Sequence, residues 1–350
     1  MEYIRLKDVD FKSKINGRVF VNFLAKDVSV RLQKDKVTKF ICLNMADKDR
    51  IVDAKLFGAT QAQIDLIQNN KTFNAALDVK PYDKSPDGFS CIVYNIEESQ
   101  TPPEYFADWS DDIPGSQKII ENALGEIISS IYGQITYPIM VKYWPEFSYY
   151  SAAKNQHHTE LGALLTHTAE VVKLADDMGD FFNNKYGADF INKSLLLAAA
   201  MLHDIGKVKE LDVDRLSGNT EYSIVASLST HIMDVLAEVD IQSYKLGLGI
   251  QSLEVNEINE EEPTKTEEQL KDEIEAVMLL KHALASHHGR LDYGSPITPN
   301  IPEAYILNRA DEMSAEMYRY NRAFKGLESG KSVSVWAGSG LKSTYKECNK

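Results

Sequence analysis

The hydrophobic pattern of the chain changes its period near residue 100, and this change limits the folds open to it. Before that point apolar and polar residues alternate, as in Gly17–Val30, where Val19, Val21 and Phe23 share one face. Beyond it apolar residues recur every three or four positions, as along Ser116–Tyr132. Period 2 is typical of half-buried strands and period 3.6 of amphipathic helices. The sequence therefore predicts a β domain followed by an all-helical domain, a multi-domain α+β protein.

The first hundred residues predict three strands, one short helix and two further strands. The strands are expected at 17–30, 38–45, 50–57, 72–79 and 89–96, and the helix at 59–70. This order is that of a five-stranded OB-like β-barrel, a fold that often binds single strands on its second and third strands. That region combines aromatic and cationic residues: Phe40, Phe57, Lys39, Arg50 and Lys55. The alternative is a barrel that serves only packing or dimer contacts.

A proline pair separates the two patterns. Residues 101–104 read TPPE, and the acidic stretch DWSDDIPG follows shortly after. We expect four parts: an OB-fold domain at 1–98, a linker at 99–115, a helical domain at 116–320 and a tail at 321–350. Residues 254–275 hold ten acidic residues and two lysines, which indicates an acidic insertion at about 250–275. This insertion is either a solvated loop or an electrostatic patch for a partner.

The net charge of −14 is unevenly distributed. Residues 1–100 carry 16 Lys and Arg against 14 Asp and Glu, whereas the remainder carries 22 against 38. Nonspecific binding to duplex DNA depends on neutralising phosphates, so a chain this acidic is not expected to coat DNA. The longest apolar run is Leu195–Leu202, far short of the ~20 residues that span a bilayer. Three cysteines without a CxxC motif and an N-terminus without an apolar stretch favour a cytoplasmic protein with no membrane partner.

The histidines point to metal chemistry. All eight lie after residue 150, and His203 with Asp204 directly follows the apolar run Leu195–Leu202. An ionisable pair in such surroundings costs several kcal/mol unless it is compensated. Coordination of a first-row divalent ion by imidazole and carboxylate supplies that compensation. No Walker A, GxSxG or GxGxxG motif occurs, so nucleotide-driven motors, serine hydrolases and Rossmann enzymes are unsupported.

The motifs around these residues resemble those of the HD phosphohydrolase superfamily. His167 in LLTHTAEVV, His203-Asp204 in MLHDIGK and Asp311 in LNRADEM match its H…HD…D signature. Three more histidines match the extended form that holds two metals: His231, His287 and His288. The segments AAKNQHHTELGALLTHT, HDIGK, SHHG and YGSP, with the OB-like domain before them, are similar to the YhaM-type 3′-to-5′ exoribonucleases over nearly the whole chain.

The resemblance implies two divalent metal ions. Four residues would hold the first: His167, His203, Asp204 and Asp311. Candidates for the second are His231, His287 and His288, with Asp204 as the bridging carboxylate. Adjacent helical residues point about 100° apart, so the two neighbouring histidines are expected to serve different ions. Such ions lower the pKa of a shared water and stabilise phosphoryl oxygens. The histidine-rich set favours Mn, with Fe, Co, Ni or Mg as alternatives.

Asp204 and Lys207 are the expected catalytic residues. Lys207 follows His203 by four positions, so on a continuous helix it would share that face and hold a substrate phosphate. The alternative is an exposed lysine near a helix end. His157 and His158 match the HH of the YhaM-type family ahead of the first ligand, and we expect them either to contact substrate or to be structural. His282 fits neither pattern and is expected to be structural.

The favoured function is therefore a metal-dependent phosphodiesterase, a 3′-to-5′ exonuclease acting on RNA or single-stranded DNA through a metal-activated water. One alternative is an HD-type hydrolase of a small or cyclic nucleotide, with the barrel as a scaffold. Another is a catalytically inactive adaptor that binds single strands, although the complete ligand set argues against it. The expected partner is single-stranded RNA or DNA, and formation of a homo-oligomer stays open.

Overall fold

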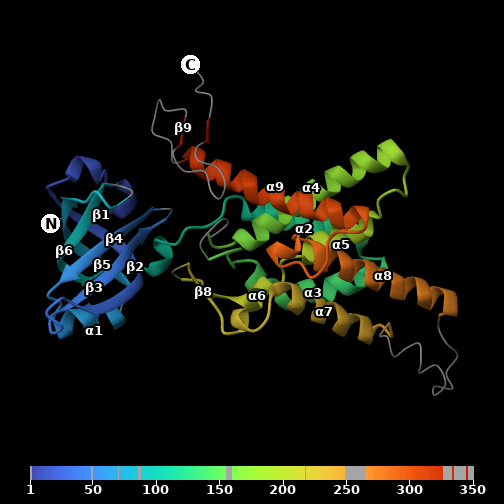
Figure 1. Cartoon of the computed structure of the whole chain (residues 1–350), viewed down its shortest axis with the longest axis horizontal. Coiled ribbons are helices and arrows are strands. Elements are labelled where there is room, and N and C mark those ends of the chain that lie inside the picture. The colour runs from blue at the N-terminus through green and yellow to red at the C-terminus, as the bar shows by residue number, and fades with distance from the viewer. Residues whose placement is uncertain are drawn as a thin grey trace. The chain divides into compact units, whose positions relative to one another are not determined.

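The computed structural model of the chain (Figure 1) describes residues 2–48, 50–69, 71–85, 88–154, 160–216, 218–248 and 265–325, and the short segments 333–334 and 344–345. The chain divides into two compact units. The first comprises Met1–Trp109 and Asp214–Asn219, and the second Ser110–Val213 and Thr220–Lys350. Each unit has its own hydrophobic core.

The first unit is a closed barrel of five long strands. These are β2 (Arg18–Leu32), β3 (Lys39–Asp47), β4 (Arg50–Phe57), β5 (Thr72–Pro81) and β6 (Phe89–Glu98). They pair in the order β2-β3-β4-β6-β5, and β5 closes the barrel by pairing with β2. Helix α1 (Gln61–Asn69) joins β4 to β5, and the short β1 (Ile4–Arg5) runs parallel to β2. The predicted OB-like barrel is confirmed, with its elements in the expected order.

Alternation along the strands divides the barrel into an inner and an outer face. Ile41 on β3 faces Leu56 on β4 in the buried core, and the next register pair, Phe40 with Phe57, points outward. The Phe40 and Phe57 rings stack with their centroids 5.6 Å apart, and Phe57 is 50% exposed. Arg50 is at the opposite end of β4, where its guanidinium covers the ring of the buried Phe11. Arg50 therefore does not belong to the outward aromatic group.

The first unit continues past residue 98, where the sequence pattern had placed a linker. A short 3-10 helix forms at Pro103–Tyr105, and Phe106 is buried against Leu24 and Ala46. The backbone carbonyl of Phe106 also accepts a hydrogen bond from the Lys48 amide at 2.9 Å. The TPPE stretch is thus followed by residues that pack on the barrel, because an apolar side chain there has a buried partner.

The second unit is a bundle of helices around α5. Its helices are α2 (Ile113–Ile127), α3 (Ile131–Phe147), α4 (Ala163–Tyr186), α5 (Lys193–Leu202), α6 (Lys207–Glu210), α7 (His231–Lys245), α8 (Glu267–Ser286) and α9 (Pro302–Lys325). Helix α5 packs against α2, α3, α4, α8 and α9, and all of Leu195–Leu202 is buried. A helix that is apolar on every side belongs in such a central position. Figure 1 shows α9 lying along α4 within this unit.

This unit differs from the expected all-helical domain in several places. Beyond residue 110 the chain also forms two ribbons of two strands each, β7 (Leu211–Asp214) with β8 (Asn219–Tyr222) and β9 (Val333–Ser334) with β10 (Thr344–Tyr345). Helix α7 begins at His231, because the Thr230 side chain caps it there. Helix α9 runs to Lys325, past the expected end of the domain at 320.

Most of the acidic insertion, residues 249–264, lies outside the described residues. Its last part leads into α8, which begins at Glu267 with a capping box between Thr266 and Gln269. Among the described residues, none of the helices combines the length and the apolar character that crossing a bilayer requires.

Candidate metal centre

Seven predicted metal ligands converge from five helices of the second unit. His167 is on the first turns of α4, and Asp311 is on α9. The other five come from helix ends: His203 and Asp204 directly after α5, His231 at the start of α7, and His287 and His288 directly after α8. All seven of these side chains are buried or half-buried. Helix ends place the chain's short polar segments at one point of an otherwise apolar bundle.

The first group consists of His167, His203 and Asp311, together with one oxygen of Asp204. The His167 Nε2 atom lies 3.2 Å from Asp311 Oδ1 and 3.4 Å from Asp204 Oδ2. The His203 Nε2 atom lies 3.4 Å from His167 Nε2 and 3.4 Å from Asp204 Oδ2. Two ligand atoms that each lie about 2.1 Å from the same ion are separated from one another by distances like those between these side chains. The first group therefore has the spacing that a shared cation requires.

The second group consists of His231, His287 and His288, whose ligand atoms lie within 4.8 Å of one another. Asp204 stands between the two groups. Its Oδ2 faces the first group, whereas its Oδ1 lies 3.7 Å from His231 Nε2. One carboxylate thus offers one oxygen to each group, which is the arrangement of a bridging ligand.

The expectation that His287 and His288 serve different groups is not what the structure shows. It assumed that both residues continue a helix, but α8 ends at Ser286. His287 caps the helix, and the following turn ends at Gly289, whose φ is +76°. Their ring centroids are 4.2 Å apart, so both rings lie on the same side of the centre.

Every histidine of the two groups has its Nδ1 atom engaged in a hydrogen bond. The partners are Ser314 Oγ for His167, the Ala200 carbonyl for His203, Glu210 Oε2 for His231, the Leu284 carbonyl for His287 and the Tyr293 carbonyl for His288. A partner on Nδ1 fixes the tautomer and the ring orientation and leaves Nε2 as the ligand atom. The five Nε2 atoms are therefore oriented for coordination.

Two of these Nε2 atoms are buried and have no hydrogen-bond partner among the described residues, those of His231 and His287. A buried, unpaired polar atom costs free energy unless something binds it. Burial and the neighbouring histidines lower the pKa of His287 well below its usual value, so its ring is neutral. A neutral imidazole with an unpaired, buried lone pair fits a metal cation.

The first group binds a proton when no cation is present. Burial lowers the pKa of His167, but hydrogen bonds to Asp204 and Asp311 outweigh burial and raise it to about 9. Burial likewise opposes ionisation of Asp311, whose pKa is nevertheless lowered by His167 and His203. A divalent ion would take the place of the His167 proton, so metal uptake at neutral pH releases a proton.

Lys207 reaches the centre by a different route from the expected one. Helix α5 ends at Leu202, so His203 and Lys207 do not share the face of a continuous helix. Lys207 is instead the first residue of α6, and its Nζ lies 2.7 Å from Asp204 Oδ2. Burial lowers the pKa of Lys207, but the ion pair with Asp204 outweighs burial and raises the pKa above its usual value. The side chain is therefore an ammonium ion.

Three hydrogen-bonding partners at this centre were not among the predicted site residues. Glu210, one turn after Lys207 on α6, accepts the hydrogen bond from His231. Ser314 on α9 contacts His167 and donates to Glu170 of α4. The spacing of Lys207 and Glu210 in KVKE was a usable signal, whereas nothing local marks Ser314 or Glu170.

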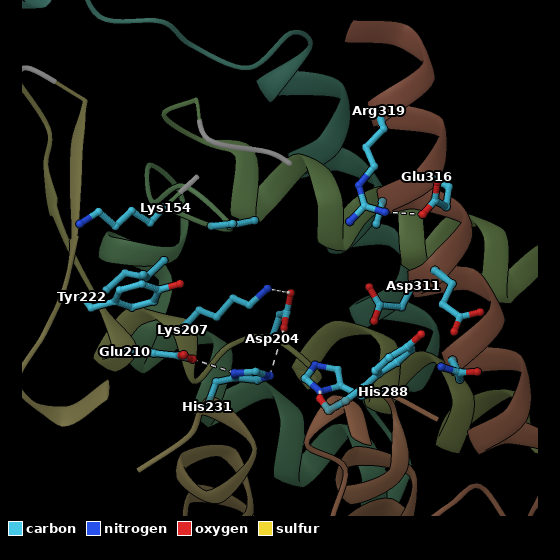
Figure 2. Close-up of a pocket in the computed structure, with 17 residues that line it drawn as sticks. Lys154, Asp204, Lys207, Glu210, Tyr222, His231, His288, Asp311, Glu316 and Arg319 are labelled. Atoms are coloured by element: carbon cyan, nitrogen blue, oxygen red, sulfur yellow. Dashed lines mark hydrogen bonds and ion pairs between the residues drawn. The ribbon is translucent and has the colours of Figure 1, made fainter. Parts of the chain in front are cut away.

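A cavity of about 1050 Å³ opens onto this candidate metal centre (Figure 2). Residues of the centre that line it are Asp204, Lys207, Glu210, His231, His288 and Asp311. Figure 2 shows Lys154 and Tyr222 on the side of Lys207, and Arg319 with Glu316 farther along α9 beyond Asp311. His157 and His158, the other predicted substrate contacts, lie outside the described residues. His282 lies outside both groups, and its Nε2 accepts a hydrogen bond from the Asn300 amide at 2.9 Å.

The glycine of HDIGK is needed where α7 approaches the turn after α5. A Cβ atom on Gly206 would lie 2.3 Å from the backbone oxygen of His231. We therefore expect Gly206→Ala to displace His231, to lower the metal content and to reduce activity at least tenfold. Overpacking of this kind costs about 1–3 kcal/mol in stability. Metal analysis and thermal unfolding measure both effects.

Gly125→Ala is the matched control, because a Cβ at this exposed position of α2 meets nothing within 4 Å. It should keep wild-type metal content. A Gly206→Ala protein that also binds wild-type amounts of metal would contradict the steric argument.

Comparisons with known proteins agree with this geometry. Residues 164–316, which contain His167, His203 and Asp311, match the HD domain family. The 3′-5′ exoribonuclease YhaM of Bacillus velezensis is 32% identical over 199 residues, which are 56% of this chain and 52% of the relative. YhaM of Bacillus subtilis is 31% identical over the same shares, and YhaM of Listeria innocua 32%. The resemblance to the YhaM-type proteins is thus confirmed over 56% of the chain, and not over nearly the whole chain as expected.

The chain spans about half the length of the curated relatives it matches. Among solved structures, a small single-stranded DNA binding protein from Mycoplasma pneumoniae matches 24% of this chain and 94% of its own. Its identity is 13% and the TM-score 0.18, a likeness too weak to carry an inference about the HD domain or the barrel.

Proposed function

We propose that this chain is a metal-dependent phosphodiesterase that removes nucleotides from the 3′ end of RNA or single-stranded DNA. The observation that carries the proposal is the position of Asp204 between two groups of oriented histidines, at the wall of a cavity of about 1050 Å³. The relatives are named 3′-5′ exoribonucleases, which favours RNA as the polymer.

Two divalent ions would fit this set of donors. His167, His203, Asp311 and Asp204 would hold one, and His231, His287 and His288 the other, with Asp204 shared. When bound, such ions lower the pKa of water and neutralise the charge that develops on phosphoryl oxygens. Five imidazoles and two carboxylates favour Mn over Mg, which prefers oxygen ligands, and Fe, Co and Ni are the alternatives.

The protein's own groups position the reaction. Hydrogen bonds on Nδ1 fix the five imidazoles, so the ligand atoms need little reorganisation. Lys207 lies beside Asp204 on the cavity wall, and its ammonium would neutralise a phosphate oxygen of the substrate. We assign Asp204 and Lys207 the catalytic roles for these reasons.

The barrel would bind the single-stranded substrate. Its outer face presents the stacked Phe40 and Phe57, and the exposed Lys39, Lys55 and Arg31 lie around them on β2, β3 and β4. Aromatic rings with nearby cations are what single-strand-binding surfaces use, because bases stack on rings and cations neutralise phosphates.

The proposal is tested with purified protein and 5′-labelled single-stranded RNA and DNA. In the presence of Mn the labelled strand should shorten from its 3′ end, one nucleotide at a time, and a chelator should stop the reaction. A 3′-phosphorothioate linkage should block shortening at the first step. Hydrolysis of cyclic or mononucleotide esters without shortening of either polymer would instead establish the small-nucleotide alternative. Binding without any hydrolysis would establish the adaptor.

Replacing both Phe40 and Phe57 with alanine is expected to raise the KM for single-stranded oligonucleotides at least tenfold. Each stacked base contributes roughly 1–3 kcal/mol, and tenfold corresponds to about 1.4 kcal/mol. The metal content of the HD domain should stay at its wild-type value. Steady-state kinetics on a labelled oligonucleotide measures the change.

The matched control is Tyr94→Ala, which removes another exposed ring, on β6 beside Arg18. It should leave KM within twofold of wild type. An equal increase in KM for Tyr94→Ala would mean that the barrel binds strands without a preferred face.

A further inference from the structure

Tyr222 and Lys154 form a ring-and-cation pair on the cavity wall, outside the two ligand groups. Tyr222 is the last residue of β8, and 59% of it is exposed although it lines the cavity. The Lys154 ammonium lies 5.9 Å from the centroid of the Tyr222 ring and also pairs with Glu221. Figure 2 shows both side chains on the same side of the cavity as Lys207.

The pair is held in place by hydrogen bonds on two sides. The buried hydroxyls of Ser151 and Thr220 bond to each other at 2.7 Å, which fixes the Lys154 segment to β8. After Tyr222, the Ser223 amide donates to the Glu210 carbonyl at 2.9 Å, and Ser223 Oγ donates to the Lys209 carbonyl at 2.6 Å. These bonds join the strand to α6, the helix that carries Lys207 and Glu210. The backbone on both sides of Tyr222 is therefore tied to the segments that carry Lys154 and Lys207.

We propose that Tyr222 stacks on a nucleobase of one of the two nucleotides that flank the cleaved phosphate, while Lys154 neutralises a neighbouring phosphate. The inference rests on the proposed function and names the part of the site that would recognise a base. An exposed aromatic face is the surface on which unpaired bases stack, and stacking tolerates any base. Ions held by the two ligand groups would contact the phosphate and not the base, so they would give no preference for a substrate that carries a base.

The test crosses enzyme variants with substrate variants. The substrates are one RNA oligonucleotide and two copies of it that lack the base at the 3′-terminal or at the penultimate position. Tyr222→Ala should lower kcat/KM on the intact oligonucleotide about tenfold, mainly through KM. On one of the two abasic oligonucleotides, the wild-type enzyme should already have a kcat/KM about tenfold lower than on the intact one. On that substrate Tyr222→Ala should lower kcat/KM by less than a further twofold. Lys154→Ala should weaken cleavage of the intact and abasic oligonucleotides alike.

Further variants separate stacking from folding. Tyr222→Phe keeps the ring and should stay within twofold of wild type, whereas Tyr222→Leu should repeat the loss of the alanine variant. Tyr244→Ala removes a ring that is 71% exposed on α7 and does not line the cavity, and it should match wild type. Metal content measured for each variant reports on the integrity of the centre.

Equal losses for Tyr222→Ala on the intact and on both abasic oligonucleotides would overturn the stacking role, and so would no loss on the intact one. Failure of the proposed function looks different, because wild type itself would then leave the intact oligonucleotide uncut.

Discussion

Replacing Asp204 with alanine is expected to reduce cleavage of RNA by about a thousandfold or more. Its two oxygens face the two ligand groups, at 3.4 Å from His167 and His203 and at 3.7 Å from His231. The substitution would therefore weaken both metal sites at once, and two-metal catalysis needs both ions. It would also leave the buried Lys207 ammonium without its carboxylate partner. Single-turnover kinetics and metal analysis of the same preparation measure the two effects.

Two variants separate coordination from folding. Asp204→Asn keeps the side-chain shape without its charge, and we expect it to lose most of the bound metal while remaining folded. His282→Ala is the matched control, because this histidine lies outside both groups and its ring accepts a hydrogen bond from the Asn300 amide, away from the ligand atoms. It should keep the full metal content. Wild-type metal content in Asp204→Ala would show that the bridging assignment is wrong.

The barrel could be predicted strand by strand because its pattern is local. Val19, Val21 and Phe23 are all buried, as their alternation requires, and the turn-forming residues between 81 and 88 mark the hairpin before β6. The order of three strands, a helix and two strands then leaves few topologies, of which the OB-like one was correct. Phe106 escaped prediction because its buried partners, Leu24 and Ala46, are far away in the sequence.

The helical unit was harder to divide. The apolar stripe that predicts one helix over 116–132 continues across a break, since α2 ends at Ile127 and α3 begins at Ile131. The Ser130 side chain caps α3 by accepting from the Gly133 amide at 3.1 Å. A Cβ on Gly133 would lie 2.1 Å from the Ile127 carbonyl oxygen. Hydrophobic periodicity does not reveal such a close turn, because the apolar residues of α2 and of α3 continue the same pattern along the sequence.

The residue types at the metal centre could be predicted, but the relations between them could not. A motif places His287 beside His288 in the chain, and only the end of α8 at Ser286 brings both rings to one group. The same holds for Ser314 and Glu170, which hold the His167 ring from two helices. Such hydrogen bonds join residues that are distant in the sequence, and one sequence contains no signal for them.

Replacing Lys207 with alanine is expected to lower kcat for RNA cleavage about a hundredfold while the metal content stays close to that of wild type. Removal of one group that stabilises transition-state charge typically costs this much. Lys207 is charged across the usual assay range, because the ion pair with Asp204 outweighs burial and raises its pKa. Loss of the ammonium should therefore lower the rate at every pH without moving the limbs of the pH profile. Lys207→Arg, which keeps the charge, should recover part of the rate.

Lys209 offers a matched control on the same short helix. It does not line the cavity, and its Nζ lies 3.2 Å from the buried Glu238 carboxylate, on which Lys142 and Tyr143 also converge. Lys209→Ala should therefore reduce thermal stability and leave kcat nearly unchanged. If Lys207→Ala lost metal in proportion to activity, the lysine would act by holding Asp204 for coordination. In that case a high metal concentration should also restore the rate. Such recovery would show that the ammonium has no separate part in stabilising the phosphate.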